Sequence, residues 1–198
     1  MTSEEQARLT KAAVVVVLQA SQEGRLTTRE DVLQALVSGG IIRQAEDQGD
    51  SDDARRRLAG EEAFAALAGI LAEHPSLASF QGLSGQTVYH CPDLLSRTYA
   101  RILDRKSSPP VLMAEEIRAN SRDYPRPVPV ELFEASPFEL PPEEIEHTLR
   151  SMAADPQYQD ITFTTTASGA VYLFSALYLE RGYAAFLAQR AESLAMNP

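Results

Sequence analysis

The sequence has little cysteine, histidine and lysine, and it has no tryptophan. Its 198 residues include one cysteine and three histidines. A single cysteine, Cys91, excludes a disulfide within the chain. His74, His90 and His147 lack the close spacing of a zinc ligand set, and His90 and Cys91 would point to opposite faces of a strand. The composition therefore predicts no metal site and no cofactor.

Long apolar segments are also absent. The longest apolar run extends from Ala12 to Leu18, far short of the ~20 residues that a membrane-spanning helix needs. The first residues are polar and acidic, which is not the pattern of a signal peptide. We expect a cytoplasmic protein that does not bind membranes.

Positive charge is scarce as well. The chain has 18 Lys and Arg against 28 Asp and Glu, a formal net charge of −10, and only Lys11 and Lys106 are lysines. A molecule with this charge repels nucleic acid and anionic membranes at long range. DNA binding would therefore depend on a local basic patch.

The spacing of apolar residues predicts an α+β chain that is mostly helical. In the first half we predict helices over residues 3–24, 27–38, 64–73 and 94–105, a short strand at 25–26 and a β-hairpin over 77–90. The second helix begins with a capping box formed by Thr27 and Glu30. In the second half we predict helices over 111–120, 130–134, 141–155 and 176–194, an extended stretch at 124–129 and a hairpin over 161–174.

A Ser-Ser-Pro-Pro segment at residues 107–110 is the predicted domain boundary. Because the order of predicted elements is similar on its two sides, we predict unit 1 over residues 1–106 and unit 2 over residues 107–198. Each length suits a small independent domain.

The two halves also align with each other. A shift of about 81 positions places Phe64 on Ile145, Pro75 on Pro156 and Phe80 on Ile161. A shift of about 84 places Ser84-Gly85 on Ser168-Gly169, and Arg97-x-Tyr99-Ala100 on Arg181-x-Tyr183-Ala184. Apolar matches occur between any two helices, so the matched Pro, Ser-Gly and Arg-x-Tyr-Ala carry the inference of an internal duplication. The change of shift predicts an insertion inside the hairpin.

The order of elements resembles the winged-helix superfamily. The resemblance implies two tandem winged-helix-like units, each with three helices, a β-hairpin wing and a closing helix. Tyr99 and Tyr183 are predicted to pack each closing helix onto its own unit. A winged helix that reads DNA normally presents basic side chains from its third helix and wing. Here the third helices begin with acidic residues, and the hairpin tips have neither Lys nor Arg.

Three groups of basic residues could still form a patch. The candidates for contact with DNA or a partner are the face formed by Arg97, Arg101, Arg105 and Lys106, and the run of Arg55, Arg56 and Arg57. The first group recurs at every fourth residue, so it forms one stripe on the closing helix of unit 1. A third group is Arg118, Arg122 and Arg126. The stripe could contact a phosphate backbone, but such a stripe is more often a solvated face or is paired with an acidic loop.

No combination of residues has the pattern of a catalytic site. Cys91 lacks a base with an orienting partner, and Gly39-Gly40 lacks the lysine and spacing of a phosphate loop. We therefore predict a non-enzymatic adaptor or regulatory protein that contacts another protein, with a homodimer as one form of association. The alternative is a DNA-binding transcriptional regulator that uses the stripe of Arg97, Arg101 and Arg105. A third alternative is a small-molecule sensor with a pocket between the units.

Overall fold

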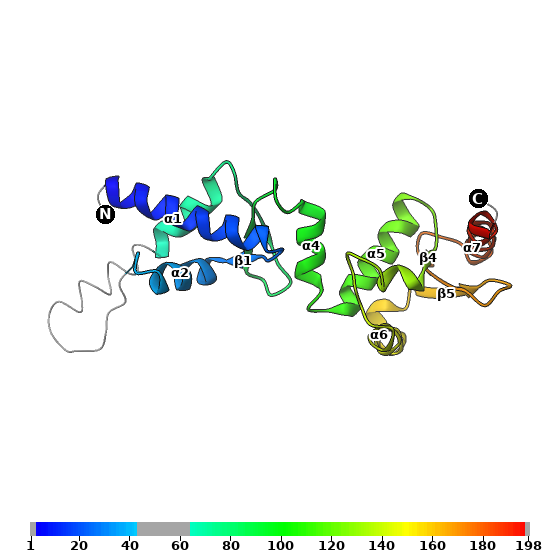
Figure 1. The fold of residues 1–198 in the computed structure, drawn as a ribbon. Coiled ribbons are helices and arrows are strands. Elements are labelled where there is room, and N and C mark those ends of the chain that lie inside the picture. Colours follow the sequence, from blue (N-terminus) through cyan, green and yellow to red (C-terminus); the bar gives the residue numbers. More distant parts are fainter. Residues whose placement is uncertain (1–2, 43–63, 197–198) are drawn as a thin grey trace. The chain divides into compact units, whose positions relative to one another are not determined.

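The computed structural model describes residues 3–42 and 64–196. The chain divides into two compact units, Met1–Asp104 and Arg105–Pro198, whereas the sequence placed the boundary after Lys106. The described residues form an α+β fold that is mostly helical, with one three-stranded antiparallel sheet in each unit (Figure 1). The predicted fold class is confirmed.

Unit 1 contains the sheet formed by β1, β3 and β2. Its elements are α1 (Ser3–Gln22), β1 (Thr27–Thr28), α2 (Arg29–Ser38), a helix over residues 64–73, β2 (Ala78–Gln81), β3 (Thr87–His90) and α4 (Arg97–Arg105). β3 is the central strand and pairs antiparallel with both neighbours. The core joins α1, α2, the helix over 64–73 and β3 through the buried residues Leu9, Ala13, Val17, Val32, Leu36, Leu67, Leu71 and Tyr89.

A capping box fixes the start of α2. The Thr28 backbone N–H donates to Asp31 Oδ2 over 2.7 Å, and the Asp31 N–H donates to Thr28 Oγ1 over 3.2 Å. The predicted box of Thr27 and Glu30 was wrong by one residue: Thr28 is the N-cap, and the buried Thr27 hydroxyl instead donates to Tyr89 O over 3.2 Å. The predicted strand at 25–26 is correspondingly two residues too early.

Unit 2 contains helices and strands in a similar order. They are α5 (Pro109–Asp123), β4 (Val128–Pro129), the 3-10 helix η1 (Val130–Phe133), α6 (Pro142–Ala154), the 3-10 helix η2 (Pro156–Tyr158), β5 (Ile161–Thr165), β6 (Val171–Ser175) and α7 (Arg181–Met196). Pro109 and Pro110 open α5 instead of forming a linker, because proline is tolerated in the first turn, where the backbone amides have no helical partner.

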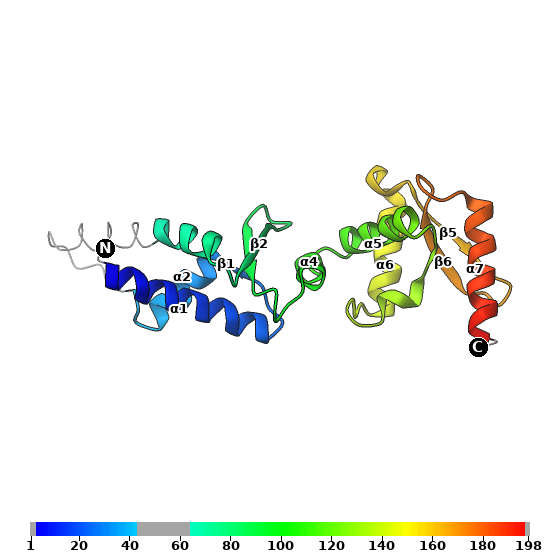
Figure 2. The same ribbon diagram turned by 90° about the horizontal axis from the view of Figure 1, so that it is seen from above.

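The sheet of unit 2 has helices on both faces. Figure 2 shows α5 and α6 on one side of β5 and β6, and α7 on the other side. On the α7 side, the core contains Phe174 from β6 and Ala184 from α7, both fully buried, together with Leu179. Adjacent residues of a strand alternate between faces, so Tyr172 lies on the same face as Phe174.

The two units share one strand order, with β3 central in the first sheet and β6 central in the second. A buried serine near the end of the first helix marks the same position in each. Ser21 Oγ accepts a bond of 2.9 Å from the Cys91 N–H, and Ser121 Oγ accepts one of 3.0 Å from the Ser175 N–H. Each bond joins the first helix of a unit to the end of its central strand.

The hairpin loops of the two units, residues 82–86 and 166–170, have equal length. Gly82 N bonds to Gln86 O in the first, and Thr166 N bonds to Ala170 O in the second, a constant separation of 84 positions. The insertion predicted inside the hairpin is therefore wrong. The additional residues of unit 2 precede the hairpin and form η2, so the register matches Phe80 with Thr164 rather than with Ile161.

Candidate interaction site

The predicted stripe of basic residues does not remain one free surface. Arg97 and Arg101 are exposed on α4, and neither forms an ion pair with a described residue. Arg105 pairs with the Glu115 carboxylate of α5. Lys106 follows α4, and its Nζ lies 2.9 Å from Glu139 Oε2. Two of the four predicted contact residues are thus already engaged with carboxylates.

The arginines of the other two predicted sets either have hydrogen-bonding partners or lie outside the residues that the structure describes. Arg118 of α5 donates two hydrogen bonds to the carboxylate of Asp160. These bonds from a cation lower the pKa of Asp160. Arg122 pairs with the neighbouring Asp123. The run of Arg55, Arg56 and Arg57 falls outside the described residues, which comprise 3–42 and 64–196.

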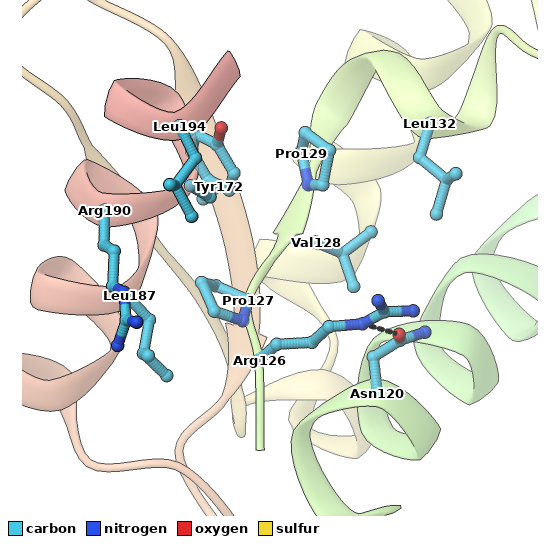
Figure 3. Close-up of a pocket in the computed structure, with 11 residues that line it drawn as sticks. Asn120, Arg126, Pro127, Val128, Pro129, Leu132, Tyr172, Leu187, Arg190 and Leu194 are labelled. Atoms are coloured by element: carbon cyan, nitrogen blue, oxygen red, sulfur yellow. Dashed lines mark hydrogen bonds between the residues drawn. The ribbon is translucent and has the colours of Figure 1, made fainter. Parts of the chain in front are cut away.

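An apolar pocket of about 480 Å³ lies within unit 2, between β4 and α7 (Figure 3). This volume is within the range of sites that bind a small molecule or a few side chains. The pocket is lined by Asn120, Arg126, Pro127, Val128, Pro129, Leu132, Tyr172, Leu187, Arg190, Ala191 and Leu194. Sequence reasoning missed this site, although Leu187, Arg190 and Leu194 are spaced as one face of a helix.

The pocket depends on the length of α7. The closing helices α4 and α7 begin at the equivalent residues Arg97 and Arg181, but α4 has 9 residues and α7 has 16. The last equivalent pair is Arg105 and Gln189. Arg190, like the other lining residues after Gln189, lies on the part of α7 that has no counterpart in α4. The two additional turns place side chains opposite β4.

Two arginines stand on opposite walls of the pocket. Arg126 is next to β4, and its Nε donates to Asn120 Oδ1 over 2.8 Å (Figure 3). Asn120 Nδ2 in turn donates to Glu116 Oε1 over 2.6 Å, which holds the amide in place. Arg190 is exposed on α7 and pairs with no carboxylate among the described residues. No Asp or Glu lines the pocket in the described structure, so its charge is positive.

An exposed aromatic pair adjoins the pocket on α7. Tyr183 is 50% exposed and Phe186 is 57% exposed, and their rings stack with centroids 6.3 Å apart. The prediction that Tyr183 packs its helix onto unit 2 is therefore wrong, because the small residues Ala184 and Ala188 occupy the buried face of α7. Leu194 continues the apolar surface, with 62% of its area exposed.

Unit 1 has no equivalent of this surface among its described residues, but it contains one unusual buried group. His90 is only 1% exposed, and neither ring nitrogen has a hydrogen-bond partner in the described structure. Burial, followed by the positive charge of Arg97, lowers the pKa of His90. The imidazole is therefore held neutral against Phe80, whose ring meets it edge-on at 6.0 Å.

Residues 3–42 and 64–196 contain no cluster of three His, Cys, Asp or Glu side chains arranged to hold a metal ion. Within the same ranges, no helix has the length and apolar character to cross a membrane. The candidate site is therefore the pocket of unit 2.

Comparisons with known proteins match the unit that contains the pocket. Residues 107–195 match the family model of the YdhW C-terminal domain. The chain is also 24% identical to the uncharacterized protein YdhW of Escherichia coli strain K12 over 131 residues, which cover 64% of this chain and 61% of that protein. The match thus spans less than two thirds of the relative. No solved structure matches the chain.

Proposed function

We propose that the chain is a non-catalytic adaptor or regulatory protein, built from two winged-helix-like units, that binds another protein through α7 of unit 2. The shared order of elements and the shared strand order support the winged-helix interpretation and an origin by duplication. The proposal places the protein in the cytoplasm, as its sequence predicts.

The observation that carries the proposal is the exposed apolar surface of α7. Aromatic rings that are half exposed to water keep apolar surface in contact with solvent. Covering that surface with another molecule is favourable, because it removes the surface from water. Tyr183 and Phe186 supply such a pair, and Leu194 extends it to the mouth of the pocket. Aromatic residues next to a cleft are typical of the centre of a protein–protein interface.

The distribution of charge favours a protein partner over DNA. α6, the third helix of unit 2 in the proposed scheme, has exposed Glu143 and Glu144 in its first turn. The hairpin loops at 82–86 and 166–170 contain no Lys or Arg. A winged helix that binds DNA needs cations at these places for its contacts with phosphates.

DNA binding is kept as a second candidate because of Arg97 and Arg101. These exposed side chains lie one helical turn apart and have no ion pair with a described residue. Two such cations could contact neighbouring phosphates, but Arg105 and Lys106 are paired and would have to exchange carboxylates for phosphates.

A cross-linking experiment in cells of the source organism tests the adaptor function. The full chain is compared with the double variant Tyr183→Ser, Phe186→Ser and with Val15→Ser, which removes an exposed apolar residue from α1. We expect one specific protein to cross-link to wild type and to Val15→Ser, and to be lost from the double variant. No specific cross-link, or one that the double variant retains, would contradict the proposal.

Titration with duplex DNA at physiological salt tests the second candidate. Tight binding that disappears in Arg97→Glu, Arg101→Glu and persists in Tyr183→Ser, Phe186→Ser would establish the DNA-binding alternative in place of the adaptor. Absence of binding would exclude it.

A further inference from the structure

We infer that the groove between β4 and α7 receives an acidic, amphipathic segment of the partner, with its carboxylates held between Arg126 and Arg190. This inference rests on the proposed function, because it specifies the chemistry of the partner that α7 contacts. The groove is the pocket of Figure 3, defined by its eleven lining residues.

The local charge of the groove is opposite to that of the chain. The whole chain has a formal net charge of −10, yet the groove is lined by two arginines and no carboxylate among the described residues. An acidic ligand is repelled by the molecule at long range, so its binding depends on this local site. An arginine beside apolar surface prefers a carboxylate partner, because guanidinium and carboxylate form two parallel charge-assisted bonds.

Arg126 is oriented for such a contact. Asn120 Oδ1 accepts the Nε–H of Arg126 and fixes the plane of the guanidinium, while none of the described residues accepts a bond from its terminal nitrogens. Figure 3 shows Arg190 on α7, beside Leu187, and the Arg126 side chain turned from β4 towards Asn120, on the side away from α7. A ligand that reaches both arginines must therefore cross the groove.

Between the arginines the surface is apolar. Tyr172 and Leu187 line the groove on the α7 side, and Val128 lines it on the β4 side. The apolar surface then continues along α7 through Leu194, beyond what a small carboxylic acid would cover. This continuity favours a peptide segment with apolar residues on one face and acidic residues beside them.

The backbone of β4 excludes one mode of peptide binding. β4 is an edge strand, and a peptide could in principle extend the sheet by pairing with it. Pro127 and Pro129 flank Val128 and have no N–H to donate to such a strand. Recognition must therefore use side chains, as when an amphipathic helix occupies a groove.

Selection of random peptides displayed on phage, with the full wild-type chain as bait, tests the inference. We expect enriched sequences that combine acidic residues with bulky apolar ones. Synthetic, fluorescein-labelled copies are then measured by anisotropy against Arg190→Glu and Arg126→Glu, with Arg8→Glu as the matched control. Arg8 is exposed on α1 and its reversal changes the net charge equally.

We expect each groove variant to weaken binding at least about tenfold, the effect of losing one well-placed charge pair. Arg190→Lys, which keeps the charge, should retain most of the affinity, and Arg8→Glu should bind as wild type does. Enrichment of neutral or basic peptides, no enrichment, or equal binding to Arg190→Glu would overturn the inference.

The proposed function and this inference fail in different ways. If the cellular partner is lost with Tyr183→Ser, Phe186→Ser but binds Arg190→Glu normally, the adaptor function stands and the acidic segment is wrong. If no partner depends on Tyr183 and Phe186, the adaptor function itself is wrong, whatever peptides the groove selects.

Discussion

His90 of unit 1 and Phe174 of unit 2 occupy the same position in their sheets. His90 pairs with Ala78 and Phe174 pairs with Thr162, and both side chains are buried. In unit 2 the site holds an apolar ring, whereas in unit 1 it holds an imidazole whose nitrogens have no partner among the described residues.

Replacement of His90 by Phe is therefore expected to stabilise unit 1. The change removes a buried polar group without a hydrogen bond, which is worth about 1 to 2 kcal/mol of the free energy of unfolding. Urea denaturation of the full chain measures the effect, with His147→Phe as the control because His147 is exposed on α6. A lower free energy of unfolding for His90→Phe would show that the ring nitrogens make a contact that matters.

Acid should weaken unit 1 through the same residue. The pKa of His90 is lowered from 6.5 in the folded chain, so the unfolded chain binds the proton more readily. The free energy of unfolding is therefore highest above pH 6.5, the pKa of the unfolded chain's histidine. It decreases as the pH falls from that value towards the folded pKa of His90. Urea midpoints measured from about pH 8 to about pH 5 should decline less in His90→Phe than in wild type or His147→Phe. Parallel curves would contradict this prediction.

Loss of the Asp160 carboxylate is expected to destabilise unit 2. Asp160 is paired with Arg118 and accepts a bond of 2.7 Å from Ser175 Oγ, and its side chain is only 8% exposed. Because Arg118 is partly exposed, we expect Asp160→Asn to lower the free energy of unfolding by about 1 to 3 kcal/mol. The control is Glu146→Gln, whose pair with Arg150 is solvent-exposed and worth less than about 0.5 kcal/mol. Equal effects of the two variants would contradict the prediction.

The same pair predicts a dependence on acid. The folded pKa of Asp160 is lowered from 3.8, so its contribution is present above that value and is lost as the pH falls through the folded pKa. Thermal unfolding of wild type should become more similar to that of Asp160→Asn under strongly acidic conditions. A constant difference between them at all pH values would mean that the carboxylate stabilises the unit without its charge.

Mutations on the two faces of α7 should differ in their effect on stability. Ala184 is fully buried against Phe174, so Ala184→Leu is expected to cost about 1 to 3 kcal/mol by overpacking. Phe186→Ser changes an exposed residue and should alter the free energy of unfolding by less than about 0.5 kcal/mol. Chemical denaturation distinguishes them. A large loss of stability in Phe186→Ser would assign the aromatic pair to folding instead of binding.

Local patterns predicted the elements of this chain better than its surfaces. Apolar spacing located the hairpins and the closing helices, because burial of one face determines both. The start of α2 was misplaced because Thr27-Glu30 and Thr28-Asp31 have the same capping pattern, and the Thr27 hydroxyl is already bonded to the Tyr89 carbonyl. Pro109 and Pro110 suit a linker or the first turn of a helix equally well.

The candidate site could not be predicted from the sequence, because its residues come from segments that are far apart in the chain. Tyr183 matches Tyr99 in the aligned halves, but its exposure follows from the small side chains that bring α7 close to the sheet. The groove forms where α7 passes β4, more than fifty positions earlier in the sequence. The pairing of Arg105 with Glu115, ten positions later, likewise does not follow from either local pattern.

α4 has 9 residues and α7 has 16, although the two helices begin at equivalent residues. In the proposed function, the additional turns of α7 supply the recognition surface, while the framework that the two units share stays the same. A chain of this kind can acquire or change specificity in one copy while the other preserves stability. Residues beyond Gln189 are then where related chains with different partners are expected to differ most.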